Sequence, residues 1–135
     1  MNKKTVHVVA GVIFDNKKLL ACQRPADKEA AGFWEFPGGK VEPGETLEQA
    51  LTRELREELS LPVMVLDEMY RLEIDRPEKV LILHFLRAFK LPASEPVACE
   101  NQQFRWLVPE AINSVEWLPS DQEFVDFLIQ TRQHI

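Results

Sequence analysis

Hydrophobic and polar positions divide the first part of the chain into short extended segments separated by polar turns. Residues 6–14 are rich in β-branched side chains and too short for an uncapped helix, which predicts a buried strand. After a polar turn, residues 19–24 are predicted to return as a second strand. Residues 25–32 are small and polar, as is typical of a loop. Residues 33–36 form a short extended piece that the Pro-Gly-Gly sequence at 37–39 is predicted to end.

One segment has clear helix signals. Residues 46–59 follow a second loop at 42–45, and Thr46 with Gln49 three positions later matches a capping box. Leucines four positions apart give this helix an apolar stripe that should face the core. Pro62 ends the helical region.

The rest of the chain adds paired strands and a final helix. The later predicted elements are, in chain order, strands at 63–73 and 80–89 around a turn at 76–79, a loop at 91–103, a strand at 104–108, a helical turn at 109–112 and a helix at 120–134. The order β-β-β-α-β-β-β-α predicts an α+β fold, with helices packed against a mixed sheet. At 135 residues, the chain is expected to form a single domain over residues 1–135.

The net charge of the chain argues against some classes of binding partner. Sixteen Lys and Arg residues stand against 22 Asp and Glu residues, for a net charge of −6. A negative surface repels the backbone of nucleic acid polymers, so we expect no such partner. A smaller polyanion would need a metal ion to bridge it to the protein.

Cysteine content and hydropathy predict the compartment. Two cysteines are too few for a disulfide framework and fit a reducing environment. No run approaches the ~20 apolar residues of a membrane span. The apolar run after Lys3 and Lys4 is short and lacks a cleavage pattern, unlike a signal peptide. We therefore expect a cytoplasmic protein that has no membrane partner.

Three glutamates stand unusually close to the apolar stripe of the 46–59 helix. At about 100° per residue, Glu54 and Glu58 fall inside the stripe and Glu57 at its edge. Carboxylates at the margin of a core are unfavourable unless a cation neutralises them. Arg53 could pair with Glu54 or Glu57, but one guanidinium cannot neutralise all three together with Glu45. Oxygen ligands at this density favour a divalent cation such as Mg²⁺ or Mn²⁺.

Residues 39–61 resemble the Nudix hydrolase family. Gly39, Glu45 and the run 53–61 follow the Nudix box at every defining position except Ser60, where the family usually has a glycine just beyond the helix. The likeness extends beyond the box to the MutT branch of the family. The segments that carry it are residues 21–25, 32–42, 100–106 and 118–121. The resemblance implies an α/β/α sandwich around a mixed central sheet, with two main helices.

The resemblance also implies the roles of residues around the box. The implied metal ligands are the carboxylates of Glu54, Glu57 and Glu58 and the carbonyl of Gly39. Arg53 would orient these carboxylates, and Glu45 would be structural. Glu100, from the 91–103 loop, matches a carboxylate that binds a metal or deprotonates the attacking water.

Substrate contacts are implied at four further positions. Arg24 matches a position that contacts the nucleotide, and Gly38 and Lys40 are expected beside the substrate. Asp121 matches a side chain that hydrogen-bonds the edge of a purine. It has an alternative interpretation as a helix N-cap, because it lies with Ser120 just before the predicted last helix. The tryptophans, at 34, 106 and 117, could stack on a base or pack in the core.

The activity that the resemblance implies is Mg²⁺-dependent hydrolysis of a nucleoside triphosphate to the monophosphate and pyrophosphate. The first expected substrate is an oxidised purine nucleotide such as 8-oxo-dGTP, and the alternative is (d)CTP or a modified pyrimidine triphosphate. A non-catalytic Nudix-like binding module is one rival interpretation, which the retained Glu54, Glu57 and Glu58 disfavour. A structural metal-binding domain is another, and it would have a closed ligand set without room for substrate. The protein is expected to be a monomer or a homodimer.

Overall fold

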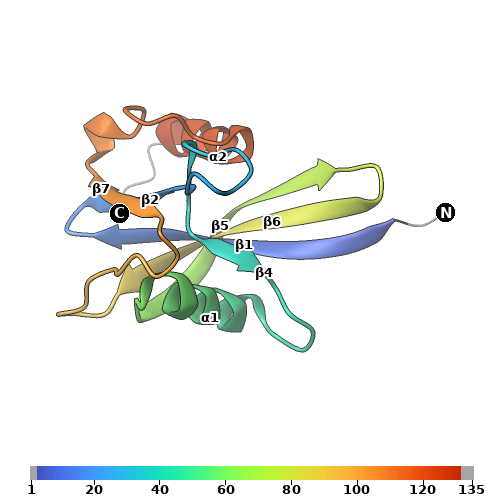
Figure 1. Cartoon of the computed structure of the whole chain (residues 1–135), viewed down its shortest axis with the longest axis horizontal. Coiled ribbons are helices and arrows are strands. Elements are labelled where there is room, and N and C mark those ends of the chain that lie inside the picture. Colours follow the sequence, from blue (N-terminus) through green and yellow to red (C-terminus); the bar gives the residue numbers. More distant parts are fainter. Residues whose placement is uncertain (1–2, 132–135) are drawn as a thin grey trace.

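A mixed β-sheet with one helix on each face forms the framework of the chain (Figure 1). The computed structural model describes residues 3–131. In chain order the elements are β1 (Lys4–Asp15), β2 (Lys18–Gln23), β3 (Trp34–Glu35), β4 (Gly38–Lys40), α1 (Leu47–Leu59), β5 (Val63–Asp75), β6 (Lys79–Lys90), β7 (Gln103–Leu107), a 3₁₀ turn (Pro109–Ala111) and α2 (Pro119–Thr131). The predicted α+β sandwich with two main helices is confirmed.

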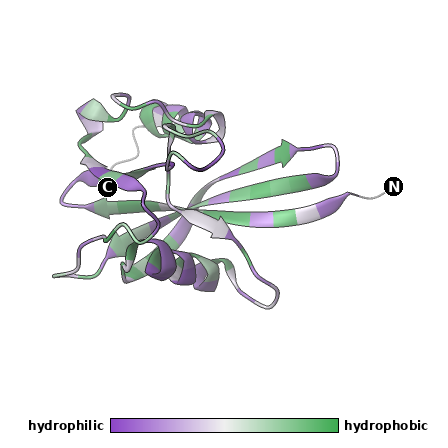
Figure 2. Ribbon diagram, in the orientation of Figure 1, coloured by the Kyte–Doolittle hydropathy of each residue, from purple (hydrophilic) through white to green (hydrophobic). Residues whose placement is uncertain are grey.

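The sheet is mixed because its two long inner strands run in the same direction. The strand order is β3-β2-β1-β6-β5, with β4 pairing with β1 and β7 with β2. Strands β1 and β6 pair in parallel over eleven positions, from Lys4–Lys79 to Phe14–Phe89. The other pairings are antiparallel. Figure 2 shows the hydrophobic residues gathered in β1 and β6, while the visible side of α1 is hydrophilic.

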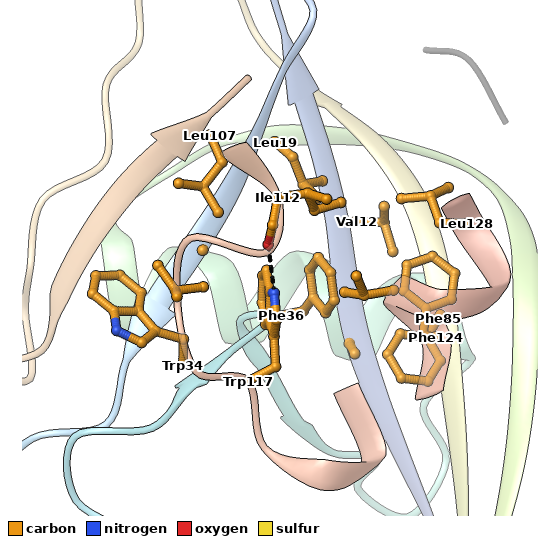
Figure 3. Packing of buried hydrophobic residues seen from close by; sticks show 14 of the residues in the cluster. Val12, Leu19, Trp34, Phe36, Phe85, Leu107, Ile112, Trp117, Phe124 and Leu128 are labelled. Carbon is orange, nitrogen blue, oxygen red and sulfur yellow. Dashed lines mark hydrogen bonds between the residues drawn. The ribbon is translucent and has the colours of Figure 1, made fainter. Parts of the chain in front are cut away.

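Side chains of β1 alternate between two separate hydrophobic clusters, one under each helix. Val9 and Ile13 pack with the leucines of α1 on one face. Val12 and Phe14 belong to the cluster under α2 on the other face, together with stacked Phe85 and Phe124. Figure 3 shows this second cluster, where the Trp117 indole N–H donates to the carbonyl of Ile112 at 2.8 Å. Each helix is therefore oriented by its own core.

Strand β4 differs from the sequence prediction, which ended the extended segment at residues 37–39. Gly38 to Lys40 instead pair antiparallel with residues 8–10 of β1. A Cβ on Gly38 would stand 1.9 Å from the carbonyl oxygen of Val9, so this close pairing requires a glycine. The Gly-Gly pair is part of the sheet, and it carries the chain from β3 across β1 toward α1.

The remaining element boundaries move by one or two residues. Strand β5 runs two residues beyond its predicted end, and α2 begins at Pro119 rather than at residue 120. The last three residues of the predicted helix, 132–134, lie outside the described residues. Between residues 3 and 131, no helix is both long enough and apolar enough to span a membrane.

Candidate active site

Local signals set the rotation of α1, and with it the direction of its glutamates. The capping box is present: the Thr46 hydroxyl accepts from the backbone N–H of Gln49 at 3.0 Å, and the Gln49 side chain accepts from the Thr46 N–H at 2.9 Å. Leu51, Leu55 and Leu59 are fully buried against the sheet. Glu54 and Glu58 are half-buried at the margin of this core, as the helical spacing predicts.

Ser60 takes over the helix-ending role that the Nudix pattern gives to glycine. It adopts a left-handed backbone conformation with φ 49°, and its N–H donates to the carbonyl of Arg56 at 3.0 Å. A left-handed conformation costs a non-glycine residue about 1–2 kcal/mol. The shape of the helix end is thus retained with serine in place of glycine.

Arg53 ties α1 to the loop before it and to β4. Its guanidinium donates to both carboxylate oxygens of Glu45, at 2.7 and 3.0 Å, and to the Lys40 carbonyl at 3.0 Å. It also donates to Glu54 and Glu57, each at 2.9 Å. The hydrogen bonds from Arg53, reinforced by the Glu42 N–H, hold the pKa of Glu45 at about 2. Glu45 is therefore an ionised partner of Arg53.

Glu54 lies against the backbone of β4. A Cβ on Gly39 would stand 2.5 Å from the carboxyl carbon of Glu54, so a larger residue at 39 would displace the Glu54 carboxylate from this position. The Gly39 backbone and the Glu54 carboxylate are accordingly brought together, as the Nudix resemblance implies.

Glu58 is the carboxylate that Arg53 does not reach. Burial raises its pKa well above the ordinary range, and the nearby carboxylates of Glu54, Glu100 and Glu35 raise it further. The raised pKa shows that these carboxyl groups are unfavourable when they are ionised together, and a bound divalent ion would remove that penalty. The residues present therefore fit a divalent metal.

The glutamate side chains of α1 do not converge into a complete set of metal ligands in this structure. Within residues 3–131, no group of three or more His, Cys, Asp and Glu side chains is arranged to hold a metal ion. Glu57 is turned toward Arg53, and its side chain is 51% exposed. Rotation of Glu57 away from Arg53 would be needed to bring it to Glu54 and Glu58.

A cavity of about 440 Å³ opens beside Glu58. Gly38, Gly39, Lys40, Glu58 and Glu100 line it together with Arg24 and Asp121. Apolar side chains of three strands contribute to the same wall, namely Val8 and Ala10 of β1, Ile74 of β5, and Leu81 and Leu83 of β6. Acidic, cationic and apolar groups thus meet in one space of a size suited to a small molecule.

Asp121 is inside α2 rather than at its N-cap, so the capping interpretation is wrong. Its carboxylate is buried and accepts from the Phe36 N–H at 2.9 Å and from the Ser120 hydroxyl at 3.1 Å. Burial, with a smaller effect of Glu35, raises the pKa of Asp121 to about 7. The carboxyl group is therefore close to its midpoint of ionisation at neutral pH, in the wall of the cavity.

Arg24 lines the cavity but is already engaged by the protein. It donates to the Glu29 carbonyl at 2.6 Å and to the Glu35 carboxylate at 3.2 Å. Burial raises the pKa of Glu35, and Arg24 partly opposes that shift. Glu35 is a cavity residue that the sequence prediction missed. Its position beside buried Trp34 in β3 puts it on the opposite side of the strand, but only the fold shows what lies on that side.

The tryptophans are core residues rather than walls of the cavity. Trp34 and Trp117 are buried, and Trp117 stacks on Phe36 with ring centroids 4.6 Å apart. Trp106 packs against the cluster under α1. None of the three is among the residues of this structure that line the cavity.

Known proteins resemble this chain over nearly its whole length. The NUDIX domain family matches residues 4–128. A CTP pyrophosphohydrolase of Escherichia coli (strain K12) is 36% identical over 131 residues, which cover 96% of this chain and 95% of that protein. An 8-oxo-dGTP diphosphatase of Proteus vulgaris is 44% identical over 86 residues, covering 63% and 77%.

Solved structures show the same similarity. The solution structure of the E. coli ORF135 protein has a TM-score of 0.82 and 35% identity, covering 96% of this chain and 92% of that one. A MutT protein from Methanosarcina mazei Go1 has a TM-score of 0.81 and covers 98% and 99%. At 24% identity, this second similarity is one of fold alone.

Proposed function

This chain belongs to the NUDIX domain family, and from that membership and its carboxylate-lined cavity we propose a nucleoside triphosphate pyrophosphohydrolase. The enzyme cleaves a phosphoric anhydride bond and releases the nucleoside monophosphate and pyrophosphate. We further propose that residues 1–135 form one such domain. The proposed setting is the cytoplasm, where free thiols such as those of Cys22 and Cys99 stay reduced.

The observation that carries the proposal is the crowding of carboxyl groups around Glu58 beside the cavity, which adds to the effect of burial in raising the pKa of Glu58. The proposed metal ligands are the Gly39 carbonyl and the carboxylates of Glu54, Glu57, Glu58 and Glu100. Mg²⁺ is the proposed ion, with Mn²⁺ as an alternative, because both prefer oxygen ligands. A bound divalent ion would neutralise phosphate charge and lower the pKa of a coordinated water.

The protein's own groups orient the reactants. Arg53 would hold Glu54 and release Glu57, whose contact with the guanidinium is the more exposed of the two. Glu100 would bind the metal or accept the proton of the attacking water. Lys40 and the Gly38 backbone lie in the cavity wall, where they would contact the phosphates. Arg24 would contact the nucleotide from the same wall.

Asp121 supports recognition of a base in this cavity. A carboxyl group with a pKa of about 7 is available both as donor and as acceptor near neutral pH. We propose 8-oxo-dGTP as the first substrate, since the names of several relatives specify that activity. The second candidate is CTP or a modified pyrimidine triphosphate. It is favoured by the E. coli CTP pyrophosphohydrolase, which matches this chain almost from end to end.

The test is a comparison of kcat/KM over ordinary and oxidised nucleoside triphosphates, with Mg²⁺ present. The proposal expects 8-oxo-dGTP to be preferred at least about tenfold over dGTP and CTP. A preference for CTP or an oxidised pyrimidine would select the second candidate. Glu57→Gln is the control and should lower kcat by at least about a hundredfold with its melting temperature retained. No metal-dependent pyrophosphate release from any nucleotide would favour a non-catalytic binding module.

A further inference from the structure

The loop that carries Glu100 is fastened to the C-terminal end of α1. The N–H of Val97 donates to the Leu59 carbonyl at 2.7 Å, and the N–H of Cys99 donates to the Glu58 carbonyl at 3.0 Å. These backbone contacts hold the residues that precede Glu100 against the end of the helix. They also place this part of the loop directly over the helix turn that contains Glu58.

Beyond Glu100 the loop is held by a side chain, that of Gln102. This side chain is buried, and its two amide atoms have different partners. The Nε2 group donates to the Glu58 carbonyl at 3.2 Å, and Oε1 accepts from the backbone N–H of Glu100 at 2.9 Å. Asn101 between them has φ 61°, so the chain turns sharply and brings Gln102 back over Glu100. One amide therefore joins the backbone of α1 to the backbone of Glu100.

The bridge restrains an exposed part of the loop. Glu100 itself is exposed, and Glu58 and Glu100 line the same cavity. Without a restraint, an exposed loop tip can move outward and take the Glu100 carboxylate away from Glu58. The Gln102 amide opposes this movement, because its two hydrogen bonds fix the backbone of Glu100 relative to that of Glu58.

We propose that Gln102 is a positioning residue, which holds Glu100 at the distance from Glu58 that the hydrolysis requires. This inference rests on the function proposed above. It assigns a role to an uncharged residue of the cavity wall, whose amide group is already bonded to the backbones of Glu58 and Glu100. Loss of the bridge leaves the fold in place and increases the mobility of the Glu100 carboxylate. It should therefore lower kcat and leave substrate affinity nearly unchanged.

The test compares Gln102→Met, which keeps the length of the side chain and removes both hydrogen bonds, with Gln103→Met. Gln103 is the adjacent residue and is exposed, so it is a matched control. Gln102→Met should lower kcat about tenfold and leave KM within about twofold, and Gln103→Met should change neither. Hydrogen exchange of the Glu100 amide in the metal-free protein should accelerate at least about tenfold in Gln102→Met alone.

A double-mutant cycle separates positioning from general damage. In the Glu100→Gln background, Gln102→Met should lower kcat by less than about twofold, because the carboxylate that it positions is already gone. A full tenfold loss in that background would overturn the inference, as would an unchanged exchange rate of the Glu100 amide. If Gln102→Met does not fold, Gln102→Asn replaces it with the same expected results, since its side chain is one methylene too short to bridge.

The two proposals fail in different ways. Wild-type protein that releases no pyrophosphate contradicts the proposed function, and amide exchange alone then decides whether Gln102 restrains Glu100. An active wild type with an equally active Gln102→Met contradicts the positioning role alone.

Discussion

At the scale of single residues, the carboxyl groups around the cavity are crowded more closely than their surroundings can stabilise in ionised form. Arg53 bonds to Glu45, Glu54 and Glu57 but not to Glu58. The pKa of Glu58 is raised as a result of burial and of the neighbouring carboxylates. A protein that keeps such a group gives up stability at that position, as is common where a residue serves function.

Replacement of Glu58 should therefore change stability and activity in opposite directions. Glu58→Gln removes a carboxyl group whose ionisation its surroundings oppose and keeps the shape of the side chain, so we expect the melting temperature of the metal-free protein to rise by a few degrees. We expect kcat to fall at least about a hundredfold, because a proposed metal ligand is lost. Glu48→Gln, the same substitution at an exposed position of α1, should leave kcat unchanged. A destabilised Glu58→Gln would contradict the inference that the surroundings of Glu58 oppose its ionisation.

Asp121 should give stability a pH dependence of a definite sign. Its pKa is about 7 in the folded protein and ordinarily near 3.8, so between these values the fold retains a proton that the unfolded chain releases. The stabilising contribution is complete below pH 3.8 and is lost as the pH rises through 7. Asp121→Asn stays neutral, its amide oxygen still accepts from the Phe36 N–H, and its free energy of unfolding should lack this slope.

The measurement is urea unfolding of wild type and Asp121→Asn at pH 5 and pH 8. Relative to wild type, the variant should gain on the order of 2 kcal/mol between the two values, since one pKa unit corresponds to about 1.4 kcal/mol. Asp126→Asn, on an exposed position of α2, should show no such gain. Parallel curves for wild type and Asp121→Asn would show that Asp121 is ionised throughout.

At the scale of elements, β4 connects the sheet to the site. Its three residues pair with β1, its Gly39 backbone lies against Glu54, and the carbonyl of Lys40 accepts from Arg53. The position of α1 relative to the cavity therefore depends on how closely β4 approaches β1. Gly38 is the residue at which that approach is tightest.

Gly38→Ala should consequently damage both the fold and the site. The added Cβ would stand 1.9 Å from the Val9 carbonyl oxygen, which forces the two strands apart. We expect a loss of about 3 kcal/mol in the free energy of unfolding, at the upper end for overpacking, and a lower kcat for the fraction that remains folded. At Gly32 a Cβ would meet nothing within 4 Å. Gly32→Ala should lower the free energy of unfolding by only about 1–2 kcal/mol, which is the cost of a positive φ for a residue other than glycine. Equal losses in the two variants would contradict this account.

Elements with local signals could be predicted from the sequence, and those set by distant contacts could not. The capping pair Thr46 and Gln49 and the leucine spacing identified α1 and the direction of Glu54 and Glu58. Strand β4 was missed because its pairing depends on β1, some thirty residues earlier. Asp121 was given two interpretations because the sequence does not show that Phe36, 85 positions away, supplies its hydrogen bond.

For the whole molecule, the two cores are independent of the proposed metal site. One hydrophobic cluster lies under each helix, and the glutamates of α1 stand at the edge of one of them. Because neither cluster contains the proposed ligand side chains, we expect the folded state to keep these cores without an ion, unlike a small domain that folds around its metal. A metal that binds the folded state alone still adds stability by mass action.

Chelation should therefore abolish activity without unfolding the protein. With EDTA, pyrophosphate release should fall to background, while far-UV circular dichroism at 25 °C stays unchanged. Addition of Mg²⁺ should restore activity and raise the melting temperature, and 100-fold excess over its dissociation constant corresponds to about 2.7 kcal/mol. Glu58→Gln should show a smaller shift with Mg²⁺, because one proposed ligand is missing. Cooperative unfolding on chelation would instead assign the metal a structural role, and the carboxylates of α1 would then hold the fold together rather than the substrate.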